Sequence, residues 1–221
     1  MAIKNENALK DQKLAAEIEL LKYRSAKESI QVQQERIALR LSQSELNNNK
    51  AQADANRVYR FTGLVTEDSI ARCVKALDLW TRRDPNKPIT IVFNSPGGDV
   101  FDGLALYDVI KELRESGHHV TTVARGMAAS MGGVLLQAGN ERIIGKNAWM
   151  MIHEVSGMSY GKTSEVEEQN KFAKRVQDRL LDILAERSTL TKKKIGRNWK
   201  KTDWWLDADE VVKLGFADKV G

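Results

Sequence analysis

Three side chains that together could hydrolyse a peptide bond occur in the order serine, histidine, aspartate. Ser130 lies within the small-residue stretch Gly126–Gly133, His153 follows it, and Asp203 comes later in the chain. A serine hydroxyl attacks a carbonyl carbon when a histidine takes its proton and a carboxylate holds that histidine in the correct tautomer. The pattern predicts a serine peptidase with Ser130 as nucleophile, His153 as general base and Asp203 as orienting acid.

The histidine and the aspartate both have competitors. His118 and His119 stand at the polar entry to a predicted strand, so we expect both to be exposed and to take no part in catalysis. Asp207 and Asp209 are close enough to Asp203 to compete for its role. Asp209 suits the first turn of a predicted helix over 210–214, where acidic side chains are favoured.

Two glycines upstream could supply the donors that stabilise a developing oxyanion. Gly97 and Gly98 follow an apolar strand, at the carboxyl end where α/β folds bind their ligands. Glycine there permits a tight turn with exposed amides, and we expect the amides of Gly98 and Met131 to form the oxyanion hole. A plain strand-to-helix turn is the alternative, as is a helix-capping role for Ser130.

The sequence contains no motif for binding a nucleotide or a metal ion that could assist hydrolysis. No phosphate-binding loop pattern appears, and no histidine, cysteine, aspartate or glutamate group has the spacing of a metal site. We therefore predict that hydrolysis at this site needs no cofactor, neither ATP nor metal.

The site is carried by alternating strands and helices from residue 58 onward. Apolar, β-branched runs such as Ile89–Phe93 are typical of strands buried on both faces of a parallel sheet, and the alternation predicts an α/β fold. The predicted strands are 58–61, 89–93, 120–124, 142–144 and 149–152, and the predicted helices are 66–80, 100–116, 131–138, 163–187 and 210–214.

Residues 1–56 differ in composition. They contain no glycine and no proline and are rich in Glu, Lys, Gln, Ala and Leu, which predicts a long helical arm. Its apolar residues keep helical spacing only in pieces, so the arm needs a partner surface or stays partly loose.

Length, charge and cysteine content limit the class of protein. The 221 residues suffice for one domain and an appendage. A charged start and the lack of a long apolar run argue against a signal peptide or membrane span. The single cysteine, Cys73, suits a reducing, cytoplasmic setting. The net charge of +5 is spread along the chain, so its basic clusters are interpreted as solvated surface, with no nucleic-acid partner.

Residues 57–221 resemble the proteolytic subunit of the Clp protease, within the crotonase-like superfamily. The likeness lies in the motif 94–98, the Ala-Ala-Ser-Met-Gly motif within 126–133, the Met-Ile-His motif 151–153 and the closing segment 204–218. It implies a β/α spiral core and assigns Ser130, His153 and Asp203 to the triad. It also implies a strand-helix handle at about 154–187, which in the family joins two heptameric rings acting on protein or peptide substrates.

Two departures from the family change the expected role. Residues 154–156 read Glu-Val-Ser where the family usually has a proline, which bears on the handle and on double-ring assembly. The 56-residue arm replaces the short pore loops that help engage an ATPase ring. A Clp-like core with such an arm is similar to the head (prohead) maturation proteases of tailed bacteriophages. That likeness implies capsid or scaffold partners for residues 1–56, in the host cytoplasm or procapsid.

Three alternatives remain at this point. The first is a proteolytic subunit of an ATP-dependent Clp protease, working with an ATPase ring. The second is a crotonase-type acyl-CoA enzyme, which the Ser130–His153 pair disfavours because such enzymes typically rely on acidic residues for proton transfer. The third is a non-catalytic assembly or scaffold protein in which the arm makes the contacts.

Overall fold

The computed structural model describes residues 27–28, 31–47, 51–52, 54–157, 160–200 and 202–221. The chain divides into two compact units, residues 1–52 and 53–221. In the first unit, the described residues are helical and their side chains are exposed. The part of the arm prediction that falls on residues 1–26 lies outside the described residues.

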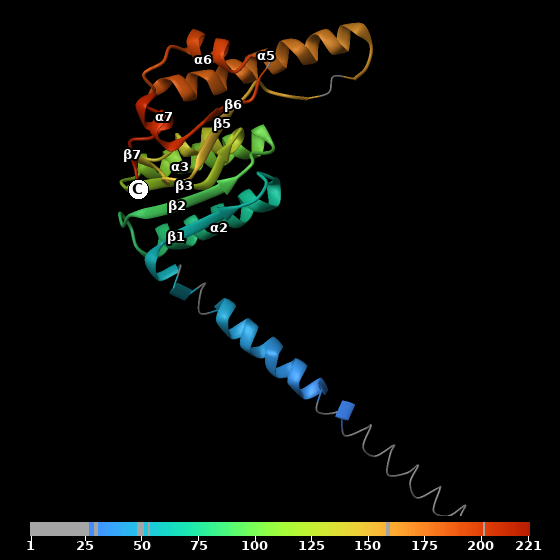
Figure 1. Ribbon diagram of the computed structural model, residues 1–221, viewed down its shortest axis with the longest axis vertical. Coiled ribbons are helices and arrows are strands. Elements are labelled where there is room, and N and C mark those ends of the chain that lie inside the picture. Colours follow the sequence, from blue (N-terminus) through green and yellow to red (C-terminus); the bar gives the residue numbers. More distant parts are fainter. Residues whose placement is uncertain (1–26, 29–30, 48–50, 53, 158–159, 201) are drawn as a thin grey trace, which may run out of the picture. The chain divides into compact units, whose positions relative to one another are not determined.

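The described residues of the second unit form a seven-stranded sheet (Figure 1). Parallel pairing runs in the order β1, β2, β3, β4, β7, while β5 pairs with β3 in parallel and with β6 in antiparallel fashion. This confirms the predicted α/β fold with a mostly parallel sheet. The strands are β1 (Val58–Thr62), β2 (Ile89–Ser95), β3 (Val120–Ala129), β4 (Glu141–Ile144), β5 (Trp149–Ile152), β6 (Trp204–Leu206) and β7 (Lys219–Val220).

Strand β3 is longer than the sequence indicated, because it continues past a bulge. Its first half pairs with β4 and its second half, from Met127, pairs with β5. The register against β2 shifts between Phe93 and Ser95. The Asn94 side chain accepts a hydrogen bond from the Met127 amide at 3.3 Å across this irregularity. The second half of β3 therefore leads directly into Ser130.

The helices that follow the strands have clear caps. Thr66 caps α2 (Glu67–Arg83) with a reciprocal capping box to Ser69. The Asp99 carboxylate caps α3 (Val100–Glu115) by accepting from the amides of Phe101 and Asp102. Capping by Asp99 fixes the point where the glycine turn ends and α3 begins. The remaining helices are α4 (Met131–Leu136), α5 (Thr163–Glu186), α6 (Lys192–Asn198) and α7 (Ala208–Lys213).

Helix α5 supplies the helical half of the predicted handle, and in Figure 1 it extends beyond the sheet. Its carboxyl-terminal turns pack into the core through side chains such as Leu180 and Leu184. The described residues between β5 and α5, 153–157 and 160–162, form no regular strand.

Two apolar clusters fill the second unit. One lies under α2, α3 and β1–β3, and the other joins β5, β6, α6, α7 and the end of α5. Leu180 and Ile183 belong to the first cluster, whereas Leu181 and Leu184 belong to the second. Helix α5 thus lies between the two clusters. Among the described residues, no helix is long and apolar enough to span a membrane.

Candidate active site

The structure brings Ser130 and His153 into direct contact. The Ser130 Oγ lies 2.8 Å from the Nε2 atom of His153, within the range of an O–H to nitrogen hydrogen bond. Ser130 follows β3 and His153 follows β5, and these two strands are parallel neighbours. The pair therefore sits where two adjacent strands end at the same edge of the sheet. A serine beside an imidazole in this geometry can lose its proton to the ring as it attacks.

The Ser130 backbone is held in an unusual conformation. Its φ is 52° and its ψ is −121°, a combination that residues other than glycine rarely adopt. The Ser130 amide donates to the Met151 carbonyl at 2.8 Å, and the Ser130 carbonyl accepts from the Gly133 amide at 3.0 Å. These bonds tie the sharp turn to β5 and to α4. The side chain is thereby directed toward His153, and it makes no capping bond to α4.

The glycine turn packs against the serine. Gly97 has a φ of +97° and Gly98 a φ of +149°, both in the region that favours glycine. The buried Ser95 hydroxyl shapes the turn by accepting from the Gly97 amide and donating to the Gly63 carbonyl. Gly98 pairs with Val65 in an isolated parallel bridge. Within the motif 94–99, Asn94 contacts the bulged part of β3. Gly97 and Gly98 form the turn, and Asp99 caps α3.

The amides of Gly98 and Met131 lie on the wall of the cavity that contains Ser130. Neither amide donates a hydrogen bond to another residue in the described part of the chain. Gly98 is exposed and Met131, the residue after Ser130, is buried. Free amides beside a nucleophile are the donors an oxyanion hole requires.

Asp203 lies beside His153, although no hydrogen bond joins these two described residues. The antiparallel register of β5 and β6 pairs Ile152 with Trp204. Continued by one residue beyond the strands, that register would set His153 opposite Asp203. Both residues line a cavity of about 470 Å³, and Asp203 is exposed.

Asp207 and Asp209, the sequence alternatives to Asp203 as the orienting acid, belong to the start of α7. Asp207 accepts a hydrogen bond from the Glu210 amide at 2.8 Å and caps α7. Asp209 lies in the first turn of the same helix, as the sequence indicated, and is exposed. Neither lines the cavity that His153 shares with Asp203.

A narrow apolar cavity of about 60 Å³ opens next to the serine and the histidine. Its walls come from α3, α4 and α5, so the handle helix closes the site from one side. The position matches that of a side-chain pocket beside a scissile bond. The apolar lining residues are Val100, Met131, Val134, Ile152, Val155, Leu180, Leu184 and Trp199.

The remaining nucleophiles and bases are placed elsewhere. His118 was expected to be exposed, which is wrong: it is 6% exposed, and its Nδ1 atom lies 3.0 Å from the Lys87 carbonyl. That bond compensates for its burial, whereas His119 is exposed as predicted. Burial raises the pKa of the Cys73 thiol, so it stays protonated. Within the described ranges, no group of three histidine, cysteine, aspartate or glutamate side chains could hold a metal ion.

The fold and the serine–histidine pair are those of a serine hydrolase of the α/β class. Residues 42–221 match the Clp protease family. The ATP-dependent Clp protease proteolytic subunit of Deinococcus radiodurans is 34% identical over 163 residues, which cover 72% of this chain and 78% of that relative. The chain therefore belongs to the Clp protease family, a family of serine peptidases. Most of the arm, residues 1–41, lies outside the family match.

Proposed function

We propose that this protein is a serine endopeptidase that cleaves extended or unfolded protein segments. Ser130 is the nucleophile, His153 the general base and acid, and Asp203 the residue that orients the imidazole. The observation that carries the proposal is the 2.8 Å contact between Ser130 Oγ and His153 Nε2 at the mouth of an apolar cavity.

The reaction would proceed in two steps. His153 takes the proton of the Ser130 hydroxyl as the oxygen attacks the peptide carbonyl, and the amides of Gly98 and Met131 donate to the oxyanion that forms. The imidazolium then protonates the leaving amine, and the acyl group stays on Ser130. A water molecule, deprotonated by His153, releases the acyl group and restores the serine.

The peptide would bind as an added strand beside the Gly97–Gly98 turn. Val65 and Gly98 already form an isolated parallel bridge beside the turn, and the described residues 153–157, which follow β5, belong to no regular strand or helix. A substrate strand between the turn and residues 154–157 would gain main-chain hydrogen bonds with little demand on its side chains. Broad sequence specificity follows.

The direct test is covalent labelling of the serine. Wild-type protein and Ser130→Ala would be treated with a fluorophosphonate probe, and their intact masses measured. We expect one adduct on wild type and none on the variant. No adduct on wild type, together with turnover of an acyl-CoA thioester, would overturn the peptidase in favour of an acyl-CoA enzyme. No adduct and no turnover would favour an assembly protein.

Two biological roles fit this peptidase. The arm of residues 1–56 supports a capsid (prohead) maturation protease, in which the arm contacts capsid or scaffold proteins. The name of the Deinococcus radiodurans relative, a subunit of an ATP-dependent protease, supports a proteolytic subunit that works with an ATPase ring. Both roles are consistent with homo-oligomeric rings, heptameric by the likeness to the family.

Self-processing and ATPase dependence separate the two roles. A maturation protease is expected to lose N-terminal mass in wild type but not in Ser130→Ala. A subunit of an ATP-dependent protease is expected to hydrolyse a folded, tagged substrate only when a Clp-type ATPase and ATP are added. Stimulation without loss of N-terminal mass would decide for the ATP-dependent role.

A further inference from the structure

Two exposed phenylalanines stack on each other beside the candidate active site. Phe101, in α3, and Phe172, in α5, have ring centroids 6.0 Å apart and ring planes 15° from parallel. Phe101 is 57% exposed and Phe172 is 51% exposed. Aromatic side chains of this size dominate cores and interfaces when they are covered. A stacked pair left half open to solvent is therefore suited to bind another apolar group.

Phe101 follows directly after a residue that lines the catalytic cavity. It is the second residue of α3, and its chain neighbour Val100 lines the cavity together with Ser130 and Gly98. Its amide donates to the Asp99 cap at 2.8 Å. The position of Phe101 is thus fixed by the same turn that presents the Gly98 amide.

An apolar row on α5 connects the other phenylalanine to the cavity. Leu180 and Leu184 line the cavity, and Val176 and Phe172 continue their four-residue spacing toward the start of the helix. Exposure rises along this row, from buried at Leu184 and Leu180 to half-buried at Val176 and exposed at Phe172. Eight residues separate Phe172 from Leu180, about 12 Å along the helix axis.

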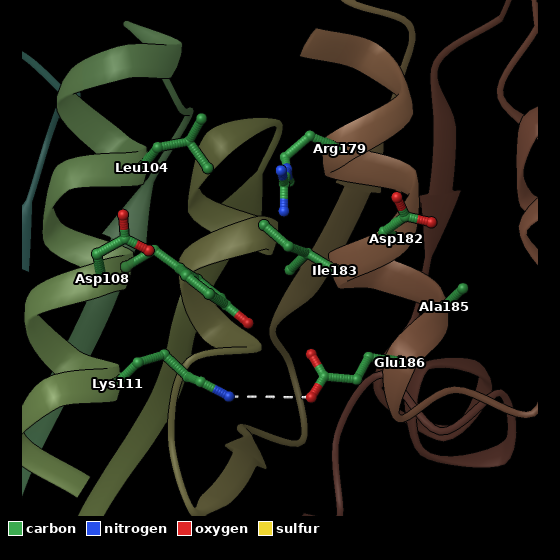
Figure 2. A pocket seen from close by; sticks show the side chains of 9 residues that line it. Leu104, Asp108, Lys111, Arg179, Asp182, Ile183, Ala185 and Glu186 are labelled. Carbon is green, nitrogen blue, oxygen red and sulfur yellow. Dashed lines mark ion pairs between the residues drawn. The ribbon is translucent and has the colours of Figure 1, made fainter. Parts of the chain in front are cut away.

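Farther along α3 and α5, toward their carboxyl-terminal ends, the surface between the two helices is more strongly charged. Here a groove of about 770 Å³ carries charged side chains of both signs. Figure 2 shows Lys111 and Glu186 facing each other across this groove, with an ion pair of 3.9 Å between them. The stacked phenylalanine pair therefore lies nearer the amino-terminal ends of α3 and α5 than this groove does.

We propose that Phe101 and Phe172 form a second subsite, which binds an apolar or aromatic side chain of the substrate peptide. This inference rests on the proposed function, because the peptide is aligned by the Ser130 site. Phe101 is next to the cavity-lining Val100 in the chain. Phe172 lies about 12 Å along α5 from the cavity-lining Leu180. An extended peptide advances about 3.3 Å per residue, so the subsite selects a residue within about four positions of the one whose side chain fills the cavity.

The test measures peptide binding to Ser130→Ala, which does not depend on turnover. Fluorescence anisotropy would compare extended peptides that differ only by Phe or Ser at one position, scanned four residues to each side of a common apolar anchor. At one position within four residues of the anchor, we expect the Phe peptide to bind about tenfold more tightly. Introducing Phe101→Ser and Phe172→Ser into the Ser130→Ala protein should abolish the preference for the Phe peptide over the Ser peptide.

Two further variants control the comparison. Phe101→Tyr with Phe172→Tyr keeps both aromatic faces and should retain the preference. Leu79→Ser, in the same Ser130→Ala protein, removes an apolar side chain of similar exposure, 52%, from α2. This variant should leave the preference for the Phe peptide unchanged. A preference that survives the double serine substitution, or no preference at any position, would overturn the subsite. A change of assembly mass in the double variant would instead make the pair a subunit contact and would also overturn it.

Failure of the subsite and failure of the peptidase give different results. If wild type forms no fluorophosphonate adduct but Ser130→Ala still shows the position-dependent preference, the proposed function fails and the subsite stands as a peptide-binding surface. If wild type is labelled at Ser130 but no preference appears, the subsite alone is wrong.

Discussion

Gly97 lies directly against Ser130. A methyl group built on the Gly97 Cα would lie 2.6 Å from the Ser130 Cβ and 2.8 Å from the Ala129 carbonyl oxygen. Contacts this short do not occur between real side chains and backbone, so either the turn or the serine would have to move. The glycine turn therefore determines where the nucleophile sits, in addition to presenting amides.

Gly97→Ala is expected to reduce activity far more than its size suggests. The variant combines the contact with Ser130 and a φ of +97° that alanine tolerates poorly. A displacement of the nucleophile by about 1 Å can lower the rate about a hundredfold. We expect a loss of kcat/KM of that size on a short peptide. Gly196→Ala in α6, whose methyl group would make only ordinary contacts of 3.6 Å or longer, is the matched control and should keep wild-type activity.

The strained backbone of Ser130 gives a prediction about stability. Strain of this kind costs on the order of 1–3 kcal/mol in residues with a side chain, and glycine relieves it at an entropic cost of about 0.5–1 kcal/mol. Ser130→Gly should therefore be more stable than Ser130→Ala by about 1 kcal/mol, although both variants lose the nucleophile. Denaturant unfolding of the two proteins at equal concentration measures the difference. Equal stability would mean that the turn relaxes in the alanine variant.

Local sequence patterns were enough to predict strands β1–β5, the helices other than α6 and the serine–histidine pair, whereas α6, β6 and β7 were not predicted. The motifs around Ser130 and His153 lie at the ends of apolar runs, and parallel strands bring such ends together. The bulge that extends β3 depends on the Asn94 side chain contacting the Met127 amide. That contact joins residues from different strands, so no local pattern reveals it.

Features that depend on long-range packing were missed. The short strand β6 gives no periodicity to read, yet its register with β5 is what places Asp203 opposite His153. The burial of His118 depends on the Lys87 carbonyl, which lies in a different segment. The stacking of Phe101 on Phe172 likewise requires α3 and α5 to be adjacent.

Asp203→Asn should lower kcat strongly if Asp203 orients His153. An amide cannot stabilise the imidazolium and favours the wrong tautomer, which costs up to about 10⁴-fold in other triads. We expect at least a hundredfold loss, with KM little changed. Asp209→Asn is the matched control, since Asp209 is an exposed first-turn residue of α7. A near-normal rate for Asp203→Asn would remove it from the triad.

Arg142 and Asp218 form an ion pair that lies outside the catalytic cavity. Arg142 is 3% exposed and donates to the Asp218 carboxylate, with a closest contact of 2.6 Å. Its guanidinium also donates to Gln137 Oε1 and to the Gly215 carbonyl. Burial by itself would raise the pKa of Asp218, but the hydrogen bonds and charge of Arg142, together with the charge of Arg187, lower it below its ordinary value.

This lowered pKa predicts how stability depends on pH. Because the carboxylate is favoured in the folded state, its contribution is present above the ordinary pKa of about 3.9 and is lost as pH falls through the lower folded value. Asp218→Asn should cost about 2 kcal/mol at pH 7, since it leaves Arg142 buried with one partner fewer. Between about pH 5 and pH 3 the variant should lose less stability than wild type, so the two urea midpoints converge. Asp78→Asn, which removes an exposed ion pair with Arg82, should follow the wild-type curve throughout. Midpoints that stay equally far apart down to pH 3 would show that Asp218 does not carry the acid dependence.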